Sequence, residues 1–163
     1  MTFSLLGRCA RTGMIGAGVT TSAISVGARC PFARAGVGAV LTQHRTDPRL
    51  GPLALDLLTY GFDAAQALQG IVAATPHRDW RQLAVIDATG RTAAFSGALV
   101  KPERGEARGQ SCVAIANIAR TTALPAAMVD AFERAPDRPL PDRLLSALQA
   151  GLDAGGEFRP LRS

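Results

Sequence analysis

Segments with the pattern of β-strands and segments with the pattern of α-helices stand in separate groups along this chain, and that order constrains its fold most. Short apolar runs bounded by turn residues predict the strands, at residues 2–9, 14–22, 36–43, 82–87, 91–97 and 111–118. Apolar residues at helical spacing predict the helices, at residues 53–60, 64–74, 124–134 and 141–154. Because strands and helices do not alternate one by one, the order favours an α+β fold with a sheet-rich core flanked by helices.

Local signals support several of these boundaries. Asp63 stands where a helix N-cap belongs, and Gly61 stands where the preceding helix would end. The turn around Gly90 predicts a tight hairpin. Residues 101–109 are charged and rich in glycine, so we expect a solvent-exposed loop there. Two glycines in the second strand, Gly16 and Gly18, predict close approach by another backbone or a ligand.

Length and composition fit one globular domain over residues 1–163. The chain has 163 residues, of which 47% are hydrophobic and 19% are charged, which is too apolar for an intrinsically disordered chain. We therefore expect a single folded domain.

The charge pattern argues against a nucleic-acid partner. The net charge is +5, but the arginines are scattered and Lys101 is the only lysine. Basic runs interleaved with aromatic residues, which are typical of nucleic-acid binding, are absent from the sequence.

The first apolar run ends at Leu6, too early for a signal peptide, and no run is long enough to span a membrane. We expect a cytoplasmic protein that binds neither nucleic acid nor membrane.

Few residues could hold a metal or a cofactor. The cysteines Cys9, Cys30 and Cys112 are far apart, and the two histidines, His44 and His77, have no metal-site spacing. We therefore expect reduced cysteines, no metal and no cofactor. His77 is expected in a loop, whereas His44 could face a cleft or be an ordinary surface residue.

The common motifs of nucleotide binding and serine catalysis are also missing. The sequence has no phosphate-binding loop and no complete Gly-x-Gly-x-x-Gly fingerprint. Ser96 precedes Gly97 at the end of a predicted strand, but the nucleophile elbow Gly-x-Ser-x-Gly is not formed. A dinucleotide enzyme or a Ser-His-Asp hydrolase is therefore poorly supported.

Thr2 is a candidate nucleophile at the head of the first predicted strand, at the edge of the fold. Once Met1 is removed, its free α-amine has an ordinary pKa of about 7.7 to 8.0 and can serve as the base for its own hydroxyl. Small residues are common after the initiator Met, however, so this residue taken alone is more often an ordinary second residue.

Four stretches of the chain together resemble the mainly bacterial family called domain of unknown function 1028 (DUF1028), which is placed in the N-terminal-nucleophile (Ntn) hydrolase superfamily. They are TFSLLGRCARTGMIGAGVTTS, VGARCPFARAGVGAVLTQHRTDPRLGPLALDLL, RQLAVIDATGRTAAFSG and VAIANI. The resemblance implies a four-layer αββα sandwich, like that of proteasome β-subunits, with Thr2 at a strand terminus. It also implies an amidohydrolase that cleaves C–N bonds in a small amide, ureido or imide substrate through an acyl-enzyme.

The same resemblance supplies candidate substrate-binding residues. The family stretch Thr-Gln-x-x-Thr-Asn-Pro appears here at residues 42–48, with Asp in place of Asn, and one asparagine of a later family motif is kept. With Ser96, the candidates are Thr42, Gln43, His44, Asp47, Ser96 and Asn117.

Departures from the family leave a second function open. Proteasome-like enzymes place a lysine beside the nucleophile, whereas Lys101 lies in the charged segment, and only an arginine such as Arg29 or Arg34 is left to supply charge there. The resemblance also implies a further apolar strand around residues 158–163, so the chain either lacks it or completes its sheet with a partner chain. The alternative to an enzyme is a ligand-binding or assembly module on the same fold, and a homo-oligomer is expected in either case.

Overall fold

The computed structural model describes residues 2–156, and within them β-strands alternate in groups with α-helices. The strands are β1 (Thr2–Arg8), β2 (Ile15–Thr21), β3 (Pro31–Arg34), β4 (Gly38–His44), β5 (Arg81–Asp87), β6 (Thr92–Ser96), β7 (Gly105–Gly109) and β8 (Cys112–Asn117). The α-helices are α1 (Leu50–Thr59), α2 (Ala64–Ala74), α3 (Leu124–Glu133) and α4 (Leu140–Asp153). Short 3-10 helices, η1 (Val26–Ala28) and η2 (Arg78–Trp80), lie in two of the connections.

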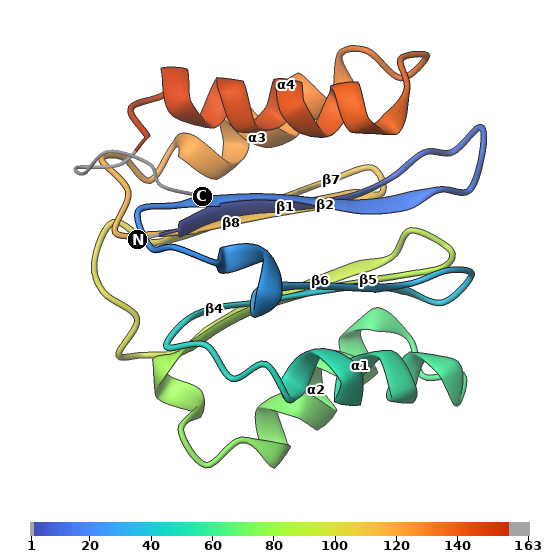
Figure 1. Ribbon diagram of the computed structural model, residues 1–163, viewed down its shortest axis with the longest axis vertical. Coiled ribbons are helices and arrows are strands. Elements are labelled where there is room, and N and C mark those ends of the chain that lie inside the picture. The colour runs from blue at the N-terminus through green and yellow to red at the C-terminus, as the bar shows by residue number, and fades with distance from the viewer. Residues whose placement is uncertain (1, 157–163) are drawn as a thin grey trace.

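The strands form two four-stranded antiparallel sheets, in the orders β2-β1-β8-β7 and β3-β4-β5-β6. Figure 1 shows the sheets stacked face to face, with α3 and α4 covering the outer face of the first sheet and α1 and α2 covering that of the second. The predicted α+β class is therefore confirmed.

Strand β1 shows why both faces of the inner strands are apolar. Phe3 and Leu5 pack against the layer of α3 and α4, whereas Leu6 packs between the two sheets. Alternate side chains point to opposite faces of a strand, so a strand covered on both sides buries all of them. This arrangement places Thr2 and Ser4, which alternate with Phe3 and Leu5, in the space between the sheets.

The expected helix signals are present. Asp63 and Gln66 form a reciprocal capping box at the start of α2, and Gly61 has a positive φ of 94° just beyond α1. The glycines of β2 do permit close approach, and the partner is a helix. A Cβ atom on Gly16 would lie 2.9 Å from Leu144 of α4, and one on Gly18 would lie 3.3 Å from Leu148.

Two strands were not expected from the sequence. The predicted loop at 101–109 is wrong in its second half, because residues 105–109 form β7, which pairs with β8 at a sheet edge. An edge strand tolerates charges such as Glu106 and Arg108, since it is paired along one side only. Similarly, β3 begins with Pro31, which a strand accepts at its first residue or on an edge.

Thr2 lies at the end of an inner strand. β1 has β2 on one side and β8 on the other, so Thr2 is flanked by Thr21 and Asn117.

None of the helices within residues 2–156 carries an apolar stretch long enough to cross a membrane. The prediction about a further strand at 158–163 lies outside the described residues.

Candidate functional site

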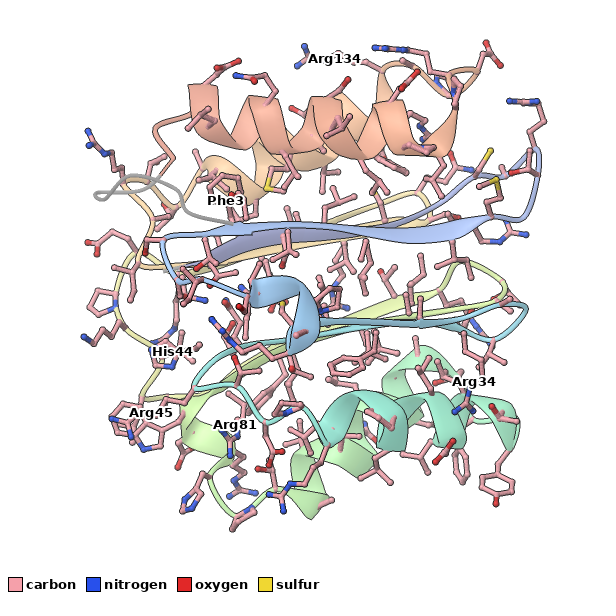
Figure 2. All side chains as sticks on the ribbon, viewed as in Figure 1. Phe3, Arg34, His44, Arg45, Arg81 and Arg134 are labelled. Carbon is pink, nitrogen blue, oxygen red and sulfur yellow. The ribbon has the colours of Figure 1, made fainter. Side chains whose placement is uncertain are left out.

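A cavity of about 270 Å³ opens at the end of the two sheets where β1 begins. We call it the Thr2 pocket. Its lining residues are Thr2, Thr21, Ala23, Val26, Arg29, Cys30, Gln43, His44, Arg45, Thr46, Trp80, Lys101, Asn117 and Ile118. They come from both sheets and from the connections that follow β2, β4, β6 and β8, so the stacking of the sheets creates the pocket. Figure 2 shows His44 and Arg45 together at this end of the molecule and Arg34 at the opposite end.

Thr2 is mostly buried yet reaches this pocket, with 9% of its surface exposed. Its hydroxyl donates a hydrogen bond of 3.1 Å to Oγ1 of Thr21 on the neighbouring strand. Thr21 is itself fixed, because its Oγ1 also accepts from the backbone N–H of Ala23 at 3.3 Å. The Thr2 hydroxyl therefore has a defined position at the floor of the pocket.

Beside Thr2, a chain of polar side chains, all buried except the half-buried Ser96, connects the two sheets. We call it the amide chain, and it consists of Ser4, Gln43, Gln82, Ser96 and Asn117. Ser4 donates to Oε1 of Gln43 at 2.7 Å, and Nε2 of Gln43 donates to Oε1 of Gln82 at 2.7 Å. The same Gln82 oxygen accepts from Nδ2 of Asn117 at 3.0 Å. Gln82 Nε2 donates to Ser96 Oγ at 3.0 Å and to the carbonyl of Ala116 at 2.9 Å.

The direction of every bond in this chain follows from one backbone carbonyl. A carbonyl oxygen only accepts, so the Ala116 carbonyl must face the nitrogen end of Gln82. The oxygen of Gln82 then faces the amides of Gln43 and Asn117, and both must offer nitrogen. Oδ1 of Asn117 consequently points away from Gln82, and this buried oxygen has no hydrogen-bond partner among the described residues.

An unpaired buried acceptor next to Thr2 indicates a place for a donor. Asn117 is 1% exposed and lines the pocket, and leaving such an oxygen unpaired costs about 1–3 kcal/mol. An N–H group of a bound ligand or a free α-amine on Thr2 would satisfy it. Since its nitrogen is already bonded to Gln82, Asn117 offers the pocket an acceptor.

His44 presents a second acceptor when it is neutral. Its Nδ1 lies 2.9 Å from the carbonyl of Trp80, which can only accept, so Nδ1 carries the proton and Nε2 has a free lone pair. Burial lowers the pKa of His44 below its ordinary value, and the positive charges of Lys101 and Arg45 lower it further. The His44 ring also lies parallel to the ring of Trp80, with a centroid separation of 6.1 Å.

Permanent charge in the Thr2 pocket is entirely positive. Arg29, Arg45 and Lys101 line it, and no Asp or Glu does so within the described part of the chain. The expectation that Lys101 lies away from the nucleophile is therefore wrong. Lys101 lies in a charged, exposed connection between β6 and β7, and this connection brings it to the lining of the same pocket. Arg29 also lines the pocket, whereas Arg34 forms an ion pair with Asp56 at 2.8 Å elsewhere.

Two pocket residues have strained backbones. His44 and Ile118 have positive φ angles of 69° and 55°, and this conformation is unfavourable for a β-branched residue such as Ile118. His44 is the last residue of β4 and Ile118 directly follows β8, and both strands end at the pocket. Backbone strain of this kind concentrates at functional sites, so it gives independent support to this location.

The structure brings four of the predicted site residues together and separates three. Thr2, Gln43, His44 and Asn117 all line the Thr2 pocket. Thr42, Asp47 and Ser96 are not among its lining residues. Thr42 points to the other face of β4 and donates to the carbonyl of Arg29 at 2.9 Å, and Ser96 belongs to the amide chain.

Asp47, the third predicted residue outside the pocket, is paired with two arginines. Its carboxylate accepts bonds of 2.9 and 2.8 Å from Arg49 and lies 3.7 Å from Arg81. Its hydrogen bonds with Arg49 lower the pKa of Asp47 from 3.8 to about 2. Asp47, a candidate substrate-binding residue, therefore has its charge already paired outside the Thr2 pocket.

Several pocket residues were missed by sequence reasoning. Trp80 lies outside the stretches that resemble the family, whereas Arg45 and Ile118 lie within them at positions that no motif singles out. The sequence carries only a compositional signal for the lone Trp80 and the lone Lys101. Within residues 2–156, no three His, Cys, Asp or Glu side chains gather in a way that could hold a metal ion.

Comparisons with known proteins agree on one family. The model of a family of unknown function, DUF1028, matches residues 2–163. The chain is similar to the crystal structure of protein SPO2555 from Silicibacter pomeroyi, which carries the same family model, with 30% sequence identity and a TM-score of 0.91. That match covers 95% of this chain and 69% of the other. No curated protein gave a match. The extent of the family match shows that this chain belongs to the DUF1028 family.

Proposed function

We propose that this protein is an Ntn-type amidohydrolase in which Thr2, once Met1 is removed, is the nucleophile for a small amide, ureido or imide substrate. The observation that carries the proposal is the position of Thr2, whose hydroxyl lies in the Thr2 pocket at the terminus of β1. The order of layers in Figure 1, helices outside two stacked sheets, is the one expected for an Ntn hydrolase and supports the same proposal.

The proposed reaction needs a base, and the lining of the pocket limits the choice. With no carboxylate among the lining residues of the described chain, the available bases are the α-amine of Thr2 and Nε2 of His44. The α-amine is joined to the same residue as the hydroxyl and is the closer of the two by construction. Arg29, Arg45 and Lys101 disfavour a protonated amine nearby, since like charges repel, and so favour the neutral form that accepts a proton.

The chemistry then proceeds in two balanced steps. The Thr2 oxygen attacks the substrate carbonyl while the amine takes the hydroxyl proton, and that proton passes to the leaving nitrogen as the C–N bond breaks. Water next attacks the acyl ester, which releases a carboxylic acid and regenerates the Thr2 hydroxyl.

The test compares Thr2→Ala and Thr2→Ser on a panel of small amides. Thr2→Ala removes the nucleophile, so hydrolysis should fall by at least about 1,000-fold, whereas Thr2→Ser keeps a hydroxyl and should retain measurable turnover. Intact mass spectrometry of the active protein should show that Met1 is absent.

A matched control separates chemistry from folding. A chain with a leucine inserted between Met1 and Thr2 keeps the Thr2 side chain but should retain its Met, and it should be inactive while unfolding like the parent protein. Full activity in Thr2→Ala, or in a protein that keeps Met1, would rule out the proposed mechanism.

A further inference from the structure

The Thr2 pocket has an unusual balance of charge for a small cavity. Three of its lining residues, Arg29, Arg45 and Lys101, are permanently positive, and within residues 2–156 none of them forms an ion pair with a carboxylate. Asp47, two residues beyond Arg45, does not neutralise them, because it is engaged by Arg49 and Arg81. The pocket therefore concentrates positive charge that has no internal counter-charge.

Two of these cations are held in place by contacts that leave donors free. The Arg45 guanidinium lies over the ring of Trp80, 4.2 Å from its centroid. A guanidinium stacked through its face keeps the N–H groups at its edge available for an anion. Arg81 also donates to the carbonyl of Arg45, which fixes the backbone there.

Arg29 is fixed in a similar way. One terminal nitrogen of Arg29 donates to the carbonyl of Ile24 at 2.7 Å, and its own carbonyl accepts from Thr42. Thr42 does not line the pocket, but its hydrogen bond holds the backbone of Arg29, which does. Cations whose side chains are already ordered lose less conformational entropy when an anion binds.

The acceptor on Asn117 adds a second requirement. Its buried, unpaired Oδ1 lines the same cavity and needs an N–H donor. A ligand that offers both an anionic group and an amide N–H would meet both features at once. Neutral amides meet only the second.

We propose, building on the proposed function, that the substrate is a small amide that also carries a carboxylate, with the carboxylate held by the cations Arg29, Arg45 and Lys101. Carboxylate paired with guanidinium forms charge-assisted hydrogen bonds, which are about twice as strong as neutral ones. The carboxylate lies either on the acyl side or on the amine side of the scissile bond, and the test includes both.

The experiment measures binding and turnover separately. Binding is measured by calorimetry on Thr2→Ala, which cannot turn its ligand over, with two matched pairs of probes. Glutaryl-4-nitroanilide is compared with valeryl-4-nitroanilide, and N-acetylglycine with N-acetylglycinamide. Hydrolysis of the same four compounds is measured on the parent protein. We expect the anionic member of at least one pair to bind and react at least about tenfold better, which corresponds to one charge-assisted bond.

Variants assign the effect to the pocket. Introduced into Thr2→Ala, Arg45→Gln and Lys101→Gln should each weaken binding of the preferred anion by about tenfold, while binding of the neutral probe should not change. Arg134→Gln is the matched control, because Arg134 is exposed at the end of α3 on an outer layer (Figure 2) and should have no effect. Raising the salt from about 0.01 M to about 0.1 M should weaken anion binding, since the Debye length falls from about 30 to about 10 Å.

The outcomes distinguish the two proposals. If parent protein hydrolyses neutral and anionic probes equally, the substrate class is wrong and the amidohydrolase proposal stands. If anions bind Thr2→Ala through Arg45 and Lys101 but the parent protein cleaves none of them, the charge preference stands and the hydrolase proposal fails. If inorganic phosphate binds Thr2→Ala more tightly than either carboxylate probe, the carboxylate assignment is overturned.

Discussion

At the scale of single residues, Asp47 is a buried charge that does not line the Thr2 pocket. Asp47 is 8% exposed and is held by Arg49 and Arg81. Arg81 in turn donates to the carbonyl of Arg45, a pocket residue. A carboxylate that the sequence suggested as a ligand contact thus supports the backbone of a cation that lines the pocket.

Asp47→Asn should lower the free energy of unfolding by about 1–2 kcal/mol at neutral pH, a value reduced because Arg49 is largely exposed to water. The folded-state pKa of about 2 lies below the ordinary 3.8. The unfolded chain therefore binds more protons as the pH falls through this range, and the contribution of Asp47 is lost between about pH 4 and pH 2. Urea titrations across this range should show the parent protein and variant converging.

Asp56→Asn is the comparison, because the Asp56–Arg34 pair is solvent-exposed on both sides. It should cost less stability than Asp47→Asn. An equal loss in the two variants would show that burial of Asp47 adds nothing.

Which residues meet in the site could be predicted only in part. Thr2, Gln43, His44 and Asn117 follow from matching short family stretches, and all four do share one cavity. Lys101 could not be placed in this way. Its position depends on the path of the connection after β6, and no local pattern in a charged, glycine-rich segment specifies that path.

At the scale of elements, contact between β1 and α3 depends on the absence of a side chain. A Cβ atom on Gly7 would lie 2.4 and 2.5 Å from ring carbons of Phe132, which is fully buried. The glycine lets the aromatic ring rest on the backbone of the strand that carries Thr2.

Gly7→Ala should therefore destabilise the protein by about 1–3 kcal/mol, because the ring or the helix must shift to make room. Gly27→Ala is the matched control, since a Cβ atom there meets nothing within 4 Å and the expected change is within about 0.5 kcal/mol. Thermal or urea unfolding measures both. If Gly7→Ala unfolds like Gly27→Ala, the close packing of β1 against α3 is not as described.

Inner strands and helices were predictable because their apolar spacing is strong, whereas the edge strands β3 and β7 were not. Gly-Glu-Ala-Arg-Gly in β7 has the composition of a loop. It becomes a strand because β8 supplies a pairing partner, which is a tertiary cause that local propensity does not contain. Apolar residue type alone is also no guide to burial, because Leu145 and Leu152 of α4 are 65% and 45% exposed.

At the scale of the whole molecule, the amide chain links two sheets whose remaining contact is largely apolar. Gln82 lies at its centre, fully buried, and its five bonds reach β4, β6, β7 and β8. Buried polar groups add little to the free energy of unfolding when all of them are hydrogen-bonded. Removing one of them lowers it strongly, because its partners are left buried and unpaired.

Gln82→Met keeps a similar volume but leaves several buried polar groups without a partner, so it should lower the free energy of unfolding by about 2–4 kcal/mol. Ser96→Ala removes one bond at the end of the chain and should cost about 1 kcal/mol. Equilibrium unfolding in urea compares them. A cost for Gln82→Met no larger than that of Ser96→Ala would mean that the chain does not couple the sheets.

The orientation of this chain begins at the Ala116 carbonyl, a main-chain atom that no substitution can change. Exchanging Gln43 or Asn117 for a carboxylate would therefore place an acceptor oxygen against Gln82 Oε1, which is itself an acceptor. Positions 43, 82 and 117 are consequently expected to drift together in evolution, so that related sequences either keep all three amides or exchange them as a group.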